Sequence, residues 1–127
     1  MKIISTTAAP PAIGPYAQAV EHNGTIYVSG CLAINPSDSE SKLLDGGVRA
    51  QTAQALINLE NILLAAGSSM DKVVKTTVYL ANMSDFSVMN EVYAGHFDGH
   101  TPARACVEVS RLPKDALVEI DAIAYIS

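Results

Sequence analysis

Charge is scarce in this sequence, and acidic side chains outnumber basic ones. Of the 127 residues, 17% are charged, whereas roughly 25% are charged in typical globular domains. The 8 basic and 13 acidic side chains give a formal net charge of −5, and no basic cluster stands out, so a nucleic-acid partner is disfavoured. A small monomer needs a polar surface, so the shortage of charge predicts a homo-oligomer in which other subunits cover part of each chain.

Long apolar runs are also missing. No stretch reaches the ~20 apolar residues of a transmembrane helix, so no membrane association is expected. The opening residues, MKIISTTAAPPAIGPY, contain one lysine and only a short apolar run before STT, which predicts no signal peptide. Cys31 and Cys106 lie 75 positions apart, without metal-type spacing. We therefore expect two reduced thiols in a cytoplasmic protein, with neither a metal nor a cofactor.

The length and the hydrophobic pattern predict a single α+β domain spanning residues 1–127. Asn23-Gly24 favours a tight hairpin turn between two short strands within residues 16–30. Apolar residues at helical spacing predict helices over 48–67 and 84–97, with Gly67 ending the first and Ser84 capping the second. Further strands are predicted at 2–5, 71–81, 103–109 and 117–126. The expected architecture is a mixed sheet with two helices packed on one face.

Arg104 lies in the middle of a predicted strand, where a permanent cation needs a partner. Side chains alternate between the faces of a strand, so Arg104 shares a face with Cys106 and Glu108. If this strand and residues 117–126 form an antiparallel hairpin, these side chains form one polar patch with Glu119 and Asp121. Charge then favours the register that places Arg104 opposite Asp121.

Two interpretations of this patch remain open. It is either a solvated sheet face with an ordinary Arg–Asp pair, which contributes ~0–1 kcal/mol, or a site for an anion. In the second case Arg104 binds a carboxylate through two parallel hydrogen bonds, while Glu119 handles a proton or a water molecule. The pattern alone favours the first interpretation.

The stretch PARACVEVSRLPKDALVEIDAIA resembles the C-terminal signature of the Rid family, the reactive intermediate deaminases. Members are also called YjgF-like, or, in older terms, L-PSP endoribonuclease or translation inhibitor. The resemblance continues through AIGPYAQAV, IYVSG, NLENILLAAG and VVKTTVYLANMSDF, and so covers essentially the whole chain. It implies a chorismate-mutase-like fold, a homotrimer with ligand sites between subunits, and hydrolysis of 2-imino acids to 2-oxo acids and ammonia.

The resemblance also implies roles for individual residues. Arg104 matches the arginine that binds the substrate carboxylate, and Glu119 matches the acid that orients or activates the hydrolytic water. Cys106 matches a position whose backbone, rather than its thiol, faces the imine nitrogen. The remaining pocket-lining matches, some of them expected from an adjacent subunit, are Tyr16, Ser29, Gly30 and Asn90.

Two departures from the family leave the substrate preference open. Many members have glutamine where this chain has Cys31, and the connection HFDGHTPAR is shorter than in some relatives. Cys106 as a nucleophile and a metal pair of His96 and His100 are weaker alternatives, because a histidine partner for the thiol and a third ligand for the metal are missing. An endoribonuclease or translation inhibitor, and a non-catalytic trimeric binder or chaperone-like protein, remain as other functions.

Overall fold

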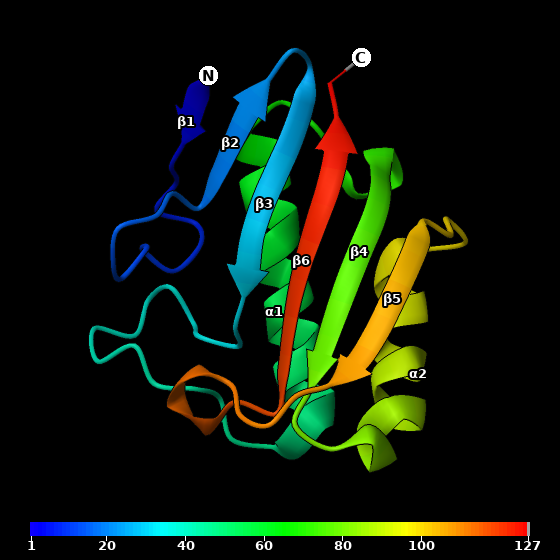
Figure 1. The fold of residues 1–127 in the computed structure, drawn as a ribbon. Coiled ribbons are helices and arrows are strands. Elements are labelled where there is room, and N and C mark those ends of the chain that lie inside the picture. The colour runs from blue at the N-terminus through cyan, green and yellow to red at the C-terminus, as the bar shows by residue number, and fades with distance from the viewer. Residues whose placement is uncertain (127) are drawn as a thin grey trace.

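Six strands form one mixed sheet, and two helices cover one of its faces (Figure 1). The structure is a computed structural model that describes residues 1–126. The strands, in chain order, are β1 (Lys2–Ile4), β2 (Ala19–His22), β3 (Thr25–Cys31), β4 (Val73–Leu80), β5 (Ala103–Glu108) and β6 (Val118–Tyr125). The helices are α1 (Gly47–Ala65) and α2 (Phe86–Phe97), with short 3-10 turns η1 (Met70–Lys72), η2 (Met83–Asp85) and η3 (Pro113–Asp115). The α+β class predicted from the sequence is confirmed.

The hairpin between β2 and β3 turns at the predicted dipeptide. Asn23 and Gly24 have φ angles of 52° and 81°, so both lie in the left-handed region that a type I′ turn requires. His22 pairs with Thr25 on the other side of the turn, and β1 adds to the outer edge of β2. Local turn chemistry is therefore enough to specify this part of the sheet.

Chain connectivity explains why both helices lie on the same face. The sheet order is β1-β2-β3-β6-β4-β5, so the connections β3–α1–β4 and β4–α2–β5 move along the sheet in the same direction. Crossovers between parallel strands are almost always right-handed, which places successive helices on the same face when the direction is kept. Figure 1 shows α1 and α2 behind the sheet.

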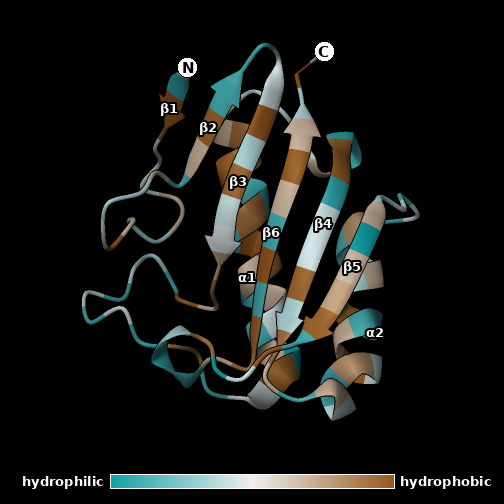
Figure 2. Cartoon of the chain, in the orientation of Figure 1, coloured by the Kyte–Doolittle hydropathy of each residue, from teal (hydrophilic) through white to brown (hydrophobic). Residues whose placement is uncertain are grey.

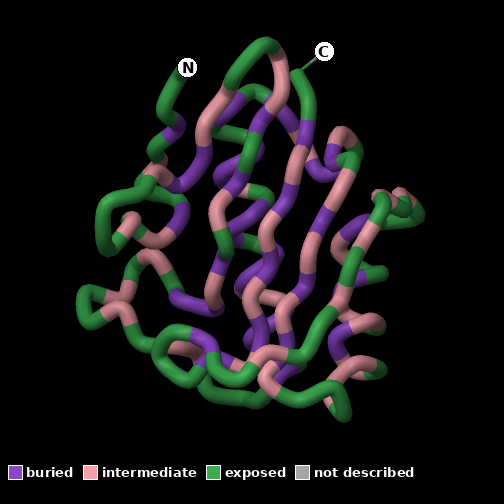
Figure 3. Tube along the Cα trace, in the orientation of Figure 1, coloured by how far each residue is buried: buried purple, intermediate pink, exposed green. Residues whose placement is uncertain are grey.

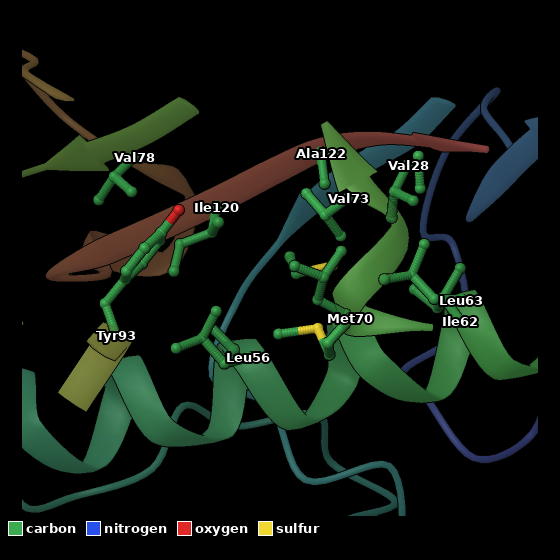
Figure 4. Close-up of a cluster of buried hydrophobic side chains, with 14 of the residues drawn as sticks. Val28, Leu56, Ile62, Leu63, Met70, Val73, Val78, Tyr93, Ile120 and Ala122 are labelled. Atoms are coloured by element: carbon green, nitrogen blue, oxygen red, sulfur yellow. The ribbon is translucent and has the colours of Figure 1, made fainter. Parts of the chain in front are cut away.

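The core lies between the sheet and these helices. The helix predicted over 48–67 is α1, and one stripe of it is buried. The members of this stripe are Thr52, Ala55, Leu56, Leu59, Leu63 and, just past the helix, Ala66. Gly67 follows in the left-handed region with φ 83°. Figure 4 shows Leu56 and Leu63 pointing from α1 toward strand residues such as Val73 and Ile120, and buried positions alternate with more exposed ones along the strands (Figure 3).

The predicted hairpin of β5 and β6 is wrong, because β4 lies between these two strands. β4 pairs with β5 in parallel, with Thr76 beside Arg104, and with β6 antiparallel, with Thr77 beside Asp121. Paired residues share a face of the sheet, and Thr76 is buried under the helices. Arg104 therefore points toward the helices, whereas Glu119 and Asp121 point to the opposite face.

The N-terminal cap predicted for α2 is also wrong. Ser84 lies inside η2, and the helix begins at Phe86 after Asp85, without a side-chain hydrogen bond to its first turn. The 3-10 turn leads the chain into α2, so a capping serine is not needed at that point.

The opposite face of the sheet carries no helix, and we call it the helix-free face (Figure 1). It exposes large apolar side chains, among them Tyr27 on β3, Val107 on β5 and Tyr125 on β6. Along the strands, apolar and polar segments alternate rather than forming a uniformly polar surface (Figure 2). Among the described residues, neither helix combines the length and the apolar character of a membrane span.

Candidate functional site: an acid pocket and an arginine edge

A cavity of about 610 Å³ lies where the N-terminal loop, β3, β6 and the turn before β6 meet. We call it the acid pocket; its lining includes Tyr16, Ser29, Gly30, Cys31 and Glu119. Four of the seven predicted site residues are therefore brought together here: Tyr16, Ser29, Gly30 and Glu119.

Glu119 approaches the backbone of Gly30 closely. The pairing of β3 with β6 shifts register between Val28 and Cys31, and the Glu119 side chain lies over the glycine at this irregularity. A Cβ atom on residue 30 would be 2.5 Å from Oε2 of Glu119 and 2.7 Å from its Cδ. Only glycine leaves room for the carboxylate in this position.

The surroundings of Glu119 favour its protonated form. Partial burial raises the pKa of its carboxyl group, and the neighbouring charge of Asp121 raises it further. Asp121 is held in place by the Tyr79 hydroxyl, which donates to Oδ2 at 3.1 Å, and by the Thr77 backbone N–H, which donates to Oδ1 at 3.2 Å. A carboxyl group with a raised pKa can accept a proton from water and return it later, as general acid–base catalysis requires.

The contacts of Ser29 and Cys31 indicate structural roles and do not activate either side chain as a nucleophile. The Ser29 hydroxyl donates to the carbonyl oxygen of Ala17 at 2.6 Å and so ties β3 to the segment that carries Tyr16. Burial, with help from Glu119 and Asp121, raises the pKa of the Cys31 thiol to about 12. Cys31 is therefore a neutral, apolar part of the pocket wall.

Gln18 is a structural residue of this pocket that the sequence analysis missed. Its buried amide oxygen accepts from the Thr6 backbone N–H at 2.7 Å, and its amide nitrogen donates to the carbonyl oxygens of Thr6 at 3.1 Å and Pro10 at 2.7 Å. These bonds hold the N-terminal loop against the sheet as one wall. The sequence does contain a clue to this role, because Gln18 lies inside the apolar run YAQAV. A polar side chain buried in such a run needs hydrogen-bond partners.

The other predicted residues lie elsewhere, at the edge of the sheet where β5 faces α2. We call this group the arginine edge: Phe86, Asn90, Tyr93, Arg104 and Cys106. The guanidinium carbon of Arg104 is 4.8 Å from the ring centroid of Tyr93 and 5.6 Å from that of Phe86. Within residues 1–126, no carboxylate forms an ion pair with Arg104 and no hydrogen bond to its guanidinium is found. Its donors are available to a ligand.

Asn90 and Cys106 flank this arginine. Asn90 is half-buried and lies one helical turn from both Phe86 and Tyr93, so it shares their side of α2. Cys106 follows two residues after Arg104 on β5 and packs partly against the core. Burial raises the pKa of its thiol, with the Arg104 charge acting in the opposite direction, which disfavours a thiolate nucleophile.

The sheet separates the two groups within one chain. Arg104, Cys106 and Asn90 are not part of the acid pocket lining, because alternation on β5 and β6 directs Arg104 and Glu119 to opposite faces. The single polar patch predicted from the sequence is therefore wrong for an isolated chain.

The weaker metal alternative finds no support in the part of the chain that the structure describes. α2 ends at Phe97, between His96 and His100, so these two do not share a helical face. A ring nitrogen of His100 instead donates to the carbonyl oxygen of Val73 at 2.7 Å. Residues 1–126 contain no cluster of three or more metal-ligating side chains.

Comparisons with known proteins assign the chain to a family. The family model described as endoribonuclease L-PSP matches residues 6–126. The 2-iminobutanoate/2-iminopropanoate deaminase of Mus musculus is 53% identical over 97% of this chain and 90% of its own. RutC family protein PH0854 of Pyrococcus horikoshii is 49% identical over 98% of this chain and 97% of its own.

Solved structures agree with the sequence relatives. TdcF of E. coli, solved with bound serine, superposes with a TM-score of 0.94 at 41% identity, over 100% of each chain. YyfA of Yersinia pestis, described as a conserved Rid family protein, has a TM-score of 0.93 at 47% identity, over 98% of each chain. The match of the family model over nearly the whole chain, together with these relatives, establishes that the chain belongs to the Rid, or endoribonuclease L-PSP, family.

Proposed function

We propose that this chain hydrolyses reactive 2-imino acids, such as 2-iminobutanoate and 2-iminopropanoate, to 2-oxo acids and ammonia. The observation that carries the proposal is the Arg104 guanidinium, which lies half-buried with no carboxylate partner in the described chain, together with Glu119, whose pKa is raised. A relative that is 53% identical bears the name of this deaminase. The bound serine of TdcF also supports a small ligand with an α-carboxylate.

The active site is composite in this proposal. Arg104 and Glu119 of one chain lie on opposite faces of its sheet. One substrate molecule can therefore contact both groups only if Arg104 comes from one copy of the chain and Glu119 from another. Contact between two different surfaces is heterologous, and such contacts form a closed ring when the rotation between neighbouring copies closes. The exposed apolar side chains of the helix-free face and the low charge content support burial of that face. We propose a homotrimer of single-domain subunits, each spanning residues 1–127, in the cytoplasm.

Arg104 binds the substrate carboxylate through two hydrogen bonds in the proposed mechanism, which fixes the position of the imine carbon. This carbon is already electrophilic, so the reaction requires no covalent nucleophile from the protein. Glu119 of the neighbouring subunit accepts a proton as water adds to the carbon, and then donates it to the departing nitrogen. As the C–N bond breaks and ammonia leaves, the Glu119 carboxylate, ionised again, takes the proton of the new hydroxyl group, and the carbonyl group of the 2-oxo acid forms.

The remaining predicted residues shape this site. The backbone at Cys106 faces the imine nitrogen and orients it, with the thiol protonated. Tyr16, Ser29 and Gly30 form the wall beside Glu119 on one subunit, and Asn90 lies beside Arg104 on the neighbouring subunit.

The test is a trapping assay. An amino-acid dehydratase generates 2-iminobutanoate in the presence of semicarbazide, and active protein lowers the amount of trapped imine. We expect the wild type to lower it, Arg104→Ala and Glu119→Gln to have no effect, and Arg104→Lys to raise KM by at least about tenfold because lysine lacks the planar fork. Arg49→Ala, at an exposed arginine paired with Glu91, is the matched control and should behave as the wild type. Equal trapping with and without the wild-type protein would refute the proposed activity.

A further inference from the structure

The arginine edge contains an arrangement that the proposed reaction does not by itself explain. The Arg104 cation lies against aromatic rings and not against an acid, and the nearer ring is tied to the same strand pair as the arginine. Tyr93 is buried on α2, and its hydroxyl forms a 2.7 Å hydrogen bond with Thr76 Oγ1. Thr76, fully buried on β4, is the residue directly beside Arg104 in the sheet.

We infer that Phe86 and Tyr93 form an aromatic seat that positions the Arg104 guanidinium for a ligand carboxylate. In this inference, which rests on the proposed function, both are positioning residues that act through Arg104. Tyr93 is the principal one, because its ring is the closer of the two and is held at both ends. Its backbone is fixed in α2 and its hydroxyl is bound to β4.

An aromatic face suits this task better than a carboxylate would. The ring attracts the cation through its quadrupole and forms no strong, directed hydrogen bond with the guanidinium. The five N–H donors of Arg104 therefore stay available to the substrate. An acidic partner at the same place would occupy the donors, and the substrate would have to displace it.

The protonation state of Tyr93 is consistent with this role. Burial raises the pKa of its hydroxyl, while the hydrogen bond with Thr76 and the charge of Arg104 act in the opposite direction. The phenol is neutral near pH 7, so it does not neutralise the arginine. Figure 4 shows the Tyr93 side chain extending from α2 to the level of Val78 and Ile120, where the sheet begins.

The seat should affect binding more than chemistry. A free arginine samples many rotamers, and a ligand that binds it must bear the entropy of ordering them. If the aromatic seat orders the guanidinium before the ligand binds, this entropy cost is smaller, and by the same amount in the substrate complex and in the transition state. Loss of uniform binding of this kind raises KM and leaves kcat nearly unchanged.

The experiment compares four variants with the wild type in the trapping assay. Tyr93→Leu removes the ring, and we expect KM to rise about tenfold with kcat within about twofold of the wild type. Tyr93→Phe keeps the ring and should restore KM to within about threefold. Phe86→Leu, at a half-buried position, should raise KM about threefold, because the Phe86 ring is the more distant of the two. Met89→Ala, at a buried residue of the same helix, is the control for lost packing and should destabilise the protein without changing KM.

A second readout does not depend on turnover. The ring current of Tyr93 should shift the NMR resonance of the Arg104 Nε–H proton, and this shift should persist in Tyr93→Phe and disappear in Tyr93→Leu. The product 2-oxobutanoate serves as the binding probe, and its affinity should fall in parallel with the rise in KM. An unchanged resonance in Tyr93→Leu, an unchanged KM in both Tyr93→Leu and Phe86→Leu, or an equal rise of KM in Met89→Ala would overturn the inference. Absence of turnover in the wild type, with the resonance shift and probe binding intact, would refute only the proposed reaction.

Discussion

Space, rather than charge alone, determines where Glu119 can act at the scale of single residues. The carboxylate occupies the volume in which a side chain of residue 30 would lie. The sequence could predict Gly30 as a pocket residue through its match to a family motif. The reason for the glycine became visible only with the register shift between β3 and β6, which no local pattern encodes.

Gly30→Ala is expected to reduce kcat/KM at least about tenfold with little change in stability. The new methyl group meets the end of a flexible side chain, so Glu119 can rotate away at a cost below about 1 kcal/mol. Its carboxylate then leaves the position from which it reaches the water. Trapping kinetics and urea unfolding at a fixed protein concentration measure the two effects.

Gly95→Ala is the matched control for this substitution. Residue 95 lies in α2, and a Cβ atom added there would have no other atom within 4 Å. The change should therefore stabilise the protein by about 0.5–1 kcal/mol and leave activity unaltered. Full activity in Gly30→Ala would contradict the importance of the close approach.

The elements of this fold are predictable from the sequence to different degrees. The hairpin at Asn23-Gly24 and the buried stripe of α1 depend on contacts close in sequence, and both were predicted correctly. The pairing of β5 with β6 was wrong because alternation tells which residues share a face and does not tell which strands are neighbours. The position of β4 between β6 and β5 depends on contacts far apart in the sequence, which the connections through α1 and α2 bring about.

The wrong pairing of β5 with β6 is also the reason that the sequence predicted one patch where the structure has two separate groups of residues. The structure brings Tyr16, Ser29, Gly30 and Glu119 together, because they lie on or beside the antiparallel pair β3 and β6. Arg104 was assigned to the same face as Glu119 only through the assumed hairpin. The alternation along β5 and along β6 is as predicted. With β4 between these strands, however, the side of β5 that carries Arg104 and the side of β6 that carries Glu119 belong to opposite faces of the sheet.

Within α1, Thr52 provides a test of packing at the scale of the element. It is fully buried, and its hydroxyl is the only such side-chain atom in residues 1–126 without a hydrogen-bond partner. Thr52→Val replaces the hydroxyl with a methyl group of similar size, so the free energy of unfolding should increase by about 1 kcal/mol. Urea denaturation at a fixed protein concentration measures the change.

Thr76→Val on β4 is the matched control for Thr52→Val, and it should lower the stability of the protein instead of raising it. The Thr76 hydroxyl is bonded to the Tyr93 hydroxyl, so its loss leaves a buried phenol unsatisfied and should destabilise the protein by about 1–3 kcal/mol. A decrease in stability for Thr52→Val would mean that its hydroxyl contributes an interaction that the fold alone does not reveal.

At the scale of the whole molecule, the low charge content and the bare sheet face have a common explanation. The helix-free face exposes Tyr27, Val107 and Tyr125 and faces away from both helices (Figure 1), and the proposed assembly would bury it. The sequence predicted an oligomer from the scarcity of charge. It gave no indication that Arg104 and Glu119 lie on opposite faces of the sheet. Under the proposed function, this arrangement makes assembly a requirement for activity and not only for stability.

Mixed oligomers test this requirement directly. Arg104→Ala and Glu119→Gln are each expected to be inactive alone, because every site of a homo-oligomer then lacks one group. When equal amounts are refolded together, a site is intact if the copy that supplies Arg104 carries the Glu119→Gln change and its neighbour carries the Arg104→Ala change. Random assembly makes this combination in about one site in four, so about a quarter of the wild-type activity should return. A mixture of Arg104→Ala with Arg104→Lys is the control and should remain near the activity of Arg104→Lys alone or below it. If both groups acted within one chain, no mixture of the two inactive variants could assemble a complete site, and the co-refolded protein would stay inactive.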